Sequence, residues 1–265
     1  MKTRFALATL FAAVLSSACG DELEVEETLG NESNEIIDGD PANTIQAQQQ
    51  GALFVSRAIV GRRFICGASY IGSNADGEHW ALTAAHCVDG ETRGLRVGFG
   101  KTRRNSYRDS DLTRVEALSI HRDWDRESIQ NDIAVLRLER RPPAARVVEL
   151  TPSGAPSFAG EVADVVGFGR GSNGALHQAQ TRILSTSNCI ESYPFITSSH
   201  LCIRDNVGAA QSVCSGDSGG PLYIRATGQQ AGIASFAEAD CRVDVAQGYT
   251  RVSAFRNWIR AATGI

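Results

Sequence analysis

The chain has 265 residues, of which 42% are hydrophobic and 21% charged, and its formal net charge at pH 7 is −4. This length and composition allow a sizeable core, arranged as one compact unit or as two small subdomains. A slightly acidic chain has no general electrostatic attraction to nucleic acid or to anionic membranes, so neither is expected as a partner.

The first 18 residues have the features of a secretory signal peptide. Lys2 and Arg4 supply positive charge, residues 5–15 are apolar but too few to span a bilayer, and residues 16–18 are small, as a cleavage site requires. We therefore predict that residues 1–18 are removed and that the protein is secreted. Cys19 leaves an alternative open, because a cysteine at this place resembles the lipidated cysteine of bacterial cell-envelope lipoproteins. A membrane is expected as a partner only if Cys19 is lipidated.

Residues 19–35 differ in composition from the rest of the chain. Seven acidic residues and no Lys or Arg lie between residues 20 and 35. Such a segment cannot bury enough apolar surface to order itself. We predict that residues 19–35 are an acidic propeptide or spacer.

Beyond residue 40, short apolar runs alternate with turn-forming residues, which is typical of an all-β sandwich or barrel. A helical period appears only at the end, where Val252, Phe255, Trp258 and Ile259 share one helix face. The apolar runs are residues 52–60, 64–71, 80–84, 95–99, 115–120, 133–138, 162–168, 222–224 and 232–236.

Three motifs follow one another along the chain: TAAHC (83–87), DIAVLRL (132–138) and GDSGGP (216–221). They offer His86 as a base, Asp132 at the head of a strand as its buried partner, and Ser218 as a nucleophile between glycines. Singly, each residue has a structural explanation: a core histidine, a strand cap or a turn serine. GDSGG also fits the elbow of α/β-hydrolases, but no histidine follows Ser218, which excludes that order.

The other four histidines are expected to be structural or surface residues. They are His79, His121, His177 and His200. A basic loop that contains Lys101, Arg103, Arg104 and Arg108 is expected to be a solvated face, and contact with the acidic residues 20–35 is the alternative.

With these three motifs in this order, residues 36–265 resemble the chymotrypsin/trypsin family of serine peptidases. The resemblance implies two six-stranded antiparallel β-barrels, at about residues 36–140 and 141–252, and a C-terminal helix over 253–265. It places the site in the cleft between the barrels. It also implies an oxyanion hole from the backbone N–H groups of Gly216 and Ser218.

The same resemblance implies the residues that bind substrate. Ser235 supports the catalytic aspartate and begins the substrate-binding segment 235–237, which includes Phe236 and Ala237. Ser212 takes the base of the side-chain pocket, where an aspartate would select Arg or Lys. Ala237 and Gln247 replace glycines of the pocket walls. We therefore expect small or medium uncharged side chains before the scissile bond.

Cleavage between Glu35 and Ile36 is implied as the activating step. The freed ammonium of Ile36 would fold inward and pair with Asp217, because a buried lone carboxylate is costly and a partner cation offsets that cost. The structural alternative is that Asp217 caps a turn. Glu35 at the cut makes a trypsin-like activator unsuitable, so a Glu-tolerant protease or the chain itself is expected to cleave there.

Seven cysteines are present, an odd number. Without Cys19, six remain, and the resemblance implies the pairs Cys66–Cys87, Cys189–Cys202 and Cys214–Cys241. Zinc is not expected, since no C-x-x-C pair occurs. Calcium is not expected either, because the loop that carries carboxylates in the family is basic here.

The sequence thus predicts a serine endopeptidase, made as a zymogen and acting as a monomer without cofactor or metal. Its expected partners are protein or peptide substrates, an activating protease and protein inhibitors. The alternative is a catalytically silent relative that binds a partner through the same scaffold.

Overall fold

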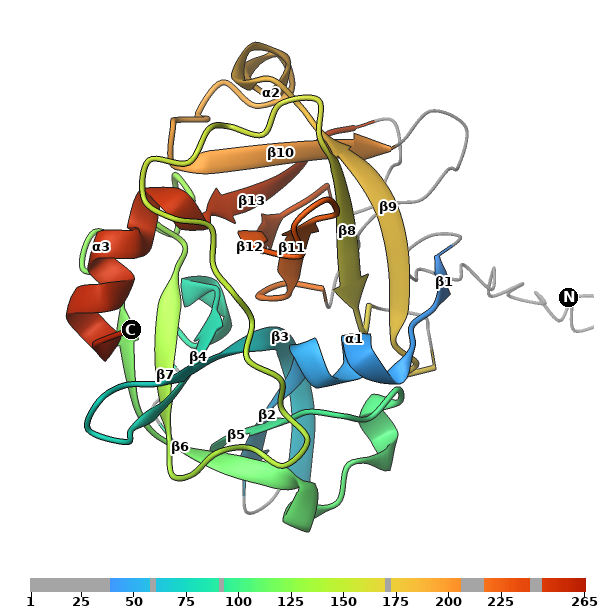
Figure 1. Cartoon of the computed structure of the whole chain (residues 1–265), viewed down its shortest axis with the longest axis vertical. Helices are drawn as coiled ribbons and strands as arrows, with labels where there is room; N and C mark the ends of the chain where they lie inside the picture. Colours follow the sequence, from blue (N-terminus) through green and yellow to red (C-terminus); the bar gives the residue numbers. More distant parts are fainter. Residues whose placement is uncertain (1–38, 58–60, 91–92, 170–172, 206–216, 239–244) are drawn as a thin grey trace, which may run out of the picture. The chain divides into compact units, whose positions relative to one another are not determined.

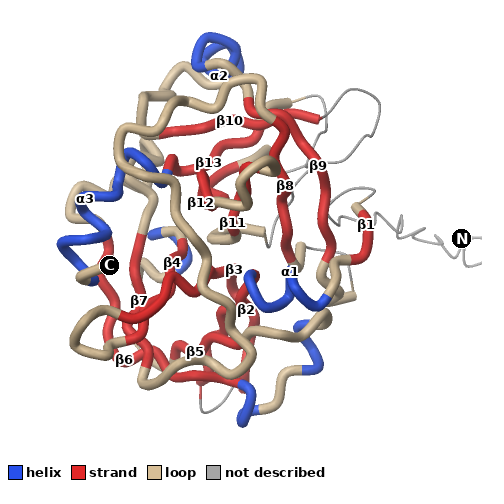
Figure 2. Tube along the Cα trace, in the orientation of Figure 1, coloured by secondary structure: helices blue, strands red, loops and turns tan. Residues whose placement is uncertain are grey.

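A computed structural model describes residues 39–57, 61–90, 93–169, 173–205, 217–238 and 245–265 (Figure 1). Their strands form two antiparallel β-barrels of six strands each, and a helix ends the chain (Figures 1 and 2). The predicted fold class is therefore confirmed.

The first barrel closes in the order β2-β3-β4-β7-β6-β5, with β5 pairing back to β2. Side chains alternate along β2: Leu53 and Val55 join the barrel interior, whereas Ala52 and Phe54 join a cluster outside it. Both faces of β2 are therefore buried. The strands are β2 (Gln50–Arg57), β3 (Gly61–Ser73), β4 (His79–Thr83), β5 (Leu95–Gly98), β6 (Leu112–Ile120) and β7 (Ala134–Leu138).

The second barrel runs β8-β9-β10-β13-β12-β11, and β11 pairs with β8 to close it. Val165, Leu222 and Tyr249 are among its interior side chains. A short strand, β1 (Asp40–Pro41), pairs with β9, so residues 40–41 extend the second sheet although we grouped them with the first barrel. The six strands are β8 (Val162–Gly167), β9 (His177–Ile183), β10 (His200–Asp205), β11 (Pro221–Ile224), β12 (Gln230–Phe236) and β13 (Gln247–Arg251).

The apolar runs missed strands that bury only one face. In β9, Ala179, Thr181 and Ile183 are buried while Gln180 and Arg182 between them are exposed, so no continuous apolar run forms. β10 and β13 were missed too, as were short helices. The latter are α1 (Thr44–Gln49), α2 (Thr186–Ser192) and the single 3₁₀ turns η1 (Ala85–Cys87), η2 (Arg104–Ser106) and η3 (Asp109–Asp111).

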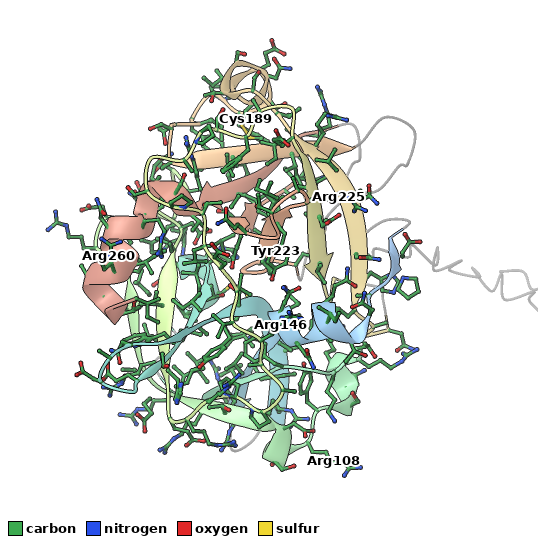
Figure 3. All side chains as sticks on the ribbon, in the orientation of Figure 1. Arg108, Arg146, Cys189, Tyr223, Arg225 and Arg260 are labelled. Atoms are coloured by element: carbon green, nitrogen blue, oxygen red, sulfur yellow. A yellow bond between two sulfur atoms is a disulfide. The ribbon has the colours of Figure 1, made fainter. Side chains whose placement is uncertain are left out.

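A mixed cluster joins the two barrels. It combines Ala52 and Phe54 of β2 with Val166 of β8 and Tyr223 of β11. Figure 3 shows Tyr223 among the packed side chains, whereas Arg108 and Arg260 point away from the body of the molecule. Burial of these apolar faces against each other fixes how the barrels meet.

The C-terminal helix α3 (Val252–Thr263) follows the last strand of the second barrel and packs against both barrels, at β7 of the first and β12 of the second. Val252, Phe255 and Ile259 are buried there, and Trp258 packs beside them, which confirms the predicted helix face. Gly264 ends the helix in the left-handed conformation, with φ 78°. In the described part of the chain, no helix has the length and apolarity needed to cross a membrane.

Candidate active site

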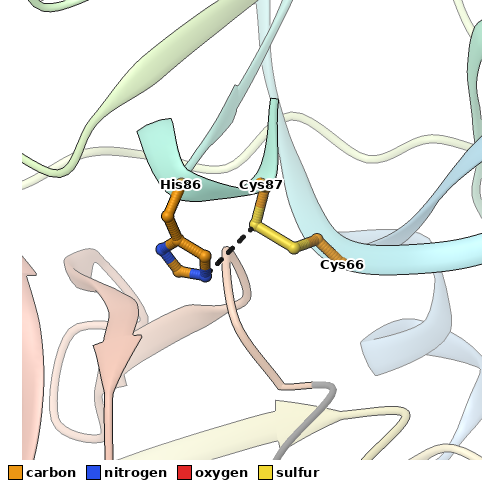
Figure 4. Close-up of side chains that lie close together, drawn as sticks. All are labelled: Cys66, His86 and Cys87. Atoms are coloured by element: carbon orange, nitrogen blue, oxygen red, sulfur yellow. Dashed lines mark hydrogen bonds between the residues drawn. A yellow bond between two sulfur atoms is a disulfide. The ribbon is translucent and has the colours of Figure 1, made fainter. Parts of the chain in front are cut away.

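His86 lies on η1, the single 3₁₀ turn that follows β4. Trp80 and Leu82 of β4 are buried in the core of the first barrel and anchor the start of this turn. A disulfide between Cys66 on β3 and Cys87 anchors its other end (Figure 4). A short turn held on both sides leaves the imidazole little freedom to move.

The carboxylate of Asp132 holds the histidine through two hydrogen bonds. Oδ1 accepts from the backbone N–H of His86 at 2.9 Å, and Oδ2 lies 2.7 Å from Nδ1 of the ring. An ionised carboxylate only accepts hydrogen bonds, so Nδ1 must carry a proton. In the neutral ring, Nε2 is then left with a free lone pair and can act as a base.

Asp132 is itself fixed by the second barrel. Its side chain is fully buried, and its Oδ2 accepts a hydrogen bond from Ser235 Oγ at 2.5 Å. Thr250 Oγ1 donates to the backbone carbonyl of the same residue at 2.8 Å. A buried carboxylate costs several kcal/mol unless donors surround it, and here the imidazole, one backbone N–H and a hydroxyl do so.

Ser218 lies in a tight turn between the barrels. Its carbonyl accepts a hydrogen bond from Gly67 N on β3 at 2.7 Å, and the next residue, Gly219, donates to Ala234 O on β12 at 2.8 Å. Gly219 has φ +75°, and a Cβ there would lie 2.6 Å from the carbonyl oxygen of Gly67. Only glycine fits this backbone and this close approach.

His86 and Ser218 line one cleft of about 410 Å³. The Cys66–Cys87 disulfide forms part of its wall, and Nε2 of His86 lies 3.7 Å from Cys87 Sγ (Figure 4). Asp132 sits behind the imidazole and is buried away from solvent. The structure therefore brings an acid–base pair and a serine to the same cleft from three distant places in the sequence.

Asp217, just before the serine, is also buried, with 3% of its surface exposed. Its Oδ1 accepts a hydrogen bond from Gly169 N at 3.0 Å. Arg104 lies close enough to interact with its charge: burial lowers the pKa of this arginine, and the negative charge of Asp217 acts in the opposite direction. Arg104 is half-buried, and the central carbon of its guanidinium lies 4.9 Å from the centre of the Phe64 ring. Arg104 is therefore not part of the solvated face that we expected for this loop.

The expected substrate-binding residues fall into different environments. Ser235 and Gln247 are buried, Phe236 is half-buried and Ala237 is exposed. The Phe236 ring lies 5.1 Å from Tyr193 and 5.2 Å from Phe195, so an aromatic cluster surrounds it. No feature of the sequence indicated that Tyr193 and Phe195 would join Phe236.

The histidines outside the site have structural surroundings. His200 is buried, with Nε2 3.1 Å from Ile129 O and Nδ1 3.2 Å from Thr197 N. His79 contacts the Tyr70 hydroxyl, His177 contacts Gly39 O, and His121 lies against the Phe255 and Trp258 rings.

Six sequence-predicted residues lie outside the described residues. They are Cys19, Ile36, Ser212, Cys214, Gly216 and Cys241. The disulfides Cys66–Cys87 and Cys189–Cys202 are formed, as the resemblance implied.

One cluster of metal-binding residue types occurs among the described residues: Cys66, His86 and Cys87. Its two sulfur atoms are bonded to each other, so neither is available as a thiolate ligand. The arrangement therefore fits a disulfide beside a histidine and does not fit a zinc site.

Comparisons with known proteins agree with this fold. Residues 36–259 match the family model described as Trypsin. Brachyurin of Leptuca pugilator is 33% identical over 244 residues, covering 87% of this chain and 99% of that protein. Chymotrypsin of Phaedon cochleariae is 32% identical over 208 residues, covering 74% of this chain and 71% of that protein. A solved structure titled HL collagenase has a TM-score of 0.74 and 26% identity, covering 86% of this chain and 98% of the collagenase chain.

The chain belongs to the trypsin family of serine peptidases. It is a serine endopeptidase of the trypsin/chymotrypsin type, and its substrates are proteins or peptides.

Proposed function

We propose that the chain hydrolyses peptide bonds with Ser218 as nucleophile, His86 as general base and acid, and Asp132 as the group that orients the imidazole. The observation that carries this assignment is the His86–Asp132 pair, joined at 2.7 Å, beside a cleft that Ser218 also lines. The proton on Nδ1 leaves Nε2 free to take the proton of an alcohol.

In this mechanism, the oxygen of Ser218 bonds to the substrate carbonyl carbon while its proton passes to Nε2 of His86. The carbonyl electron pair moves onto oxygen, where the backbone N–H groups of Gly216 and Ser218 would hold it. His86 then gives its proton to the amine nitrogen as the C–N bond breaks. Water repeats the sequence on the acyl-enzyme and frees the serine.

The chain is made as a zymogen in this proposal and is activated by cleavage between Glu35 and Ile36. The support is the buried carboxylate of Asp217, which lies one residue from the nucleophile, because a buried charge is stable only with hydrogen-bond donors or cations around it. An Ile36 ammonium would join these groups and so couple proteolysis to the shape of the oxyanion hole. The activating protease would tolerate Glu35, and the chain itself is a candidate.

Substrates with small or medium uncharged side chains before the scissile bond are proposed, because Ser212 offers no charge to Arg or Lys. The signal-like residues 1–18 and the disulfides are consistent with a secreted monomer, open to protein inhibitors, and lipidation at Cys19 would hold it in a cell envelope instead. A peptide library profile dominated by Arg or Lys would overturn the proposed specificity.

Labelling with a fluorophosphonate, which reacts only with an activated serine, tests the assignment. The full chain should label weakly before cleavage at Ile36 and strongly after it, and Ser218→Ala should label in neither state and lose peptidase activity by several orders of magnitude. Equal labelling before and after cleavage would contradict the proposal that the chain is a zymogen. Absence of labelling in processed chain would favour a silent binding protein.

A further inference from the structure

The cleft beside His86 and Ser218 carries charged side chains that the proposed mechanism does not use. Arg63 on β3, Arg126 and Asp89 all line it. Charges at the wall of a substrate cleft select among substrates, because unlike charges attract and like charges repel. The balance of these three charges therefore decides what the cleft prefers.

Two of the three charges compensate each other. Arg126 Nη2 lies 3.0 Å from Asp89 Oδ2, and Trp124 Nε1 donates to the same oxygen at 3.1 Å. The hydrogen bonds from Trp124 and Arg126 lower the pKa of Asp89, so it stays ionised at neutral pH. This aspartate thus offsets the charge of Arg126.

Arg63 differs from Arg126 in having no such partner. Among the residues that the structure describes, no acceptor forms a hydrogen bond or ion pair with its guanidinium, and the residue is exposed. Its neighbour Arg62, by contrast, pairs with Asp109 at 2.9 Å. The wall of the cleft therefore carries one uncompensated positive charge.

This wall lies on a definite side of the reacting serine. Its lining comes from β3, the histidine turn, Asp89, Arg126 and Ser218, and includes no residue of the segment 235–237. The family resemblance implies that Ala237 of that segment forms a wall of the pocket for the side chain before the scissile bond, and in the proposed function His86 protonates the amine that leaves. The residues after the bond therefore run past His86 and the Cys66–Cys87 disulfide.

We propose that Arg63 makes this cleft a binding site for the leaving segment of the substrate and selects peptides with Asp or Glu among the first three residues after the scissile bond. The inference rests on the proposed function and adds a substrate class to it. The charge is exposed, so the preference should be modest, about two- to fivefold in kcat/KM for Glu over Gln. It should shrink as salt is added.

A set of matched peptides tests the proposal. A mixed peptide library digested by the fluorophosphonate-reactive enzyme first fixes a good cleavage sequence by mass spectrometry. Three quenched fluorescent peptides are then compared in low and high salt. They carry Glu, Gln or Lys, respectively, at all three positions after the bond. The enzymes are the wild type, Arg63→Gln and Arg63→Glu, with Arg122→Gln as control because Arg122 is 89% exposed and outside the cleft lining.

The wild type and Arg122→Gln should prefer Glu to Gln to Lys, Arg63→Gln should lose the preference, and Arg63→Glu should reverse it. Arg122→Gln should cut the Gln peptide as the wild type does, and fluorophosphonate labelling of both Arg63 variants should show that they fold and keep a reactive serine. If the wild type cuts the Glu, Gln and Lys peptides equally well, or if Arg63→Gln still prefers the Glu peptide, the inference fails and the proposed function stands. If no peptide is cut, both fail.

Discussion

Asp132 shows at the scale of single residues how the site is fixed. Its carboxylate accepts from the imidazole and backbone of His86 and from Ser235, while Thr250 holds its carbonyl. The carboxylate oxygens and the backbone oxygen thus have separate donors. The contribution of each donor can be measured separately.

Ser235→Ala should lower kcat/KM by about tenfold, because a hydrogen bond to a charged group is worth about 1.5 kcal/mol and this one holds the oxygen that meets Nδ1. Thr250→Val is the matched control, since it removes a hydroxyl donor to the backbone of the same aspartate. It should lower the unfolding free energy while changing kcat/KM much less. Steady-state kinetics and urea unfolding of both variants measure this, and equal losses of activity would contradict a role for Ser235 at the carboxylate.

Gly219→Ala should destabilise the protein and abolish peptidase activity. Its φ of +75° and the contact with Gly67 O add steric conflict to backbone strain, together costing about 3 kcal/mol or more. Gly228→Ala separates the two effects, because Gly228 has φ +72° but nothing within 4 Å of an added Cβ. That control should cost about 1 kcal/mol and keep activity. Similar unfolding midpoints for both variants would argue against a close approach at Gly219.

At the scale of elements, the charged loop around η2 connects the first barrel with residues 168–169, of which Gly169 contacts Asp217. Arg104 Nη1 donates to Phe168 O at 3.4 Å, and Gly169, the next residue, donates to Asp217. The backbone N–H of Arg104 bonds Gly174 O at 2.7 Å. A loop of the first barrel thus supports the segment that holds the aspartate beside the nucleophile.

Arg104→Met should therefore reduce kcat severalfold and lower the unfolding free energy by about 1 kcal/mol, a value discounted for partial exposure. Methionine retains much of the packing on Phe64 but removes the positive charge near Asp217. Arg103→Met is the control, because Arg103 is exposed in the same loop. Kinetics and chemical unfolding should separate the two variants, and unchanged kcat in Arg104→Met would show that its charge does not support the site.

At the scale of the whole molecule, the site exists because the two barrels meet. Ser235, Thr250 and Ser218 of the second half bond to Asp132 and Gly67 of the first. Helix α3 and the cluster around Phe54 and Tyr223 hold the halves together. Loosening this interface would separate the acid–base pair from the serine.

His200 links the barrels and should make their stability depend on pH. Burial lowers the pKa of this histidine, against the opposing effects of its hydrogen bonds to Ile129 and Thr197 and of Asp132. As pH falls through the unfolded value of about 6.5, the unfolded chain takes up this proton before the folded one. The stabilisation is therefore present above that pH and is lost below it.

Urea unfolding at pH 7.5 and pH 5.0 measures this dependence. The wild type should lose more unfolding free energy between the two pH values than His200→Gln, in which the titrating group is absent. The carboxylates are common to both proteins, so their effects cancel in the comparison. An identical pH dependence would mean that His200 does not contribute.

Short apolar runs predicted an all-β sandwich or barrel, and the amphipathic pattern at the end predicted the terminal helix, whereas the two six-stranded barrels came from the family resemblance. The apolar runs missed β9, where buried and exposed side chains alternate, and they missed β10 and β13, whose buried residues include polar ones such as His200, Gln247 and Thr250. Residues 40–41 also joined the second sheet against expectation, because strand pairing depends on which edge is free and not on position in the chain.

For the site, the three motifs in their order led to the choice of His86, Asp132 and Ser218, although each residue alone has a structural explanation. Ser235 came from the family resemblance. Thr250, Arg63 and Arg104 left no signal, because their surroundings come from segments distant in sequence.

The sequence by itself therefore determined the class of chemistry and the all-β fold, and its motifs supplied the residues that we propose to react. Only the tertiary structure decided that Arg104 turns inward, that Phe236 joins an aromatic cluster and that Arg63 lines the cleft with no ion-pair partner among the described residues. The physical reason is that a side chain's type is local information, whereas its burial and its charge balance are set by neighbours that folding brings together.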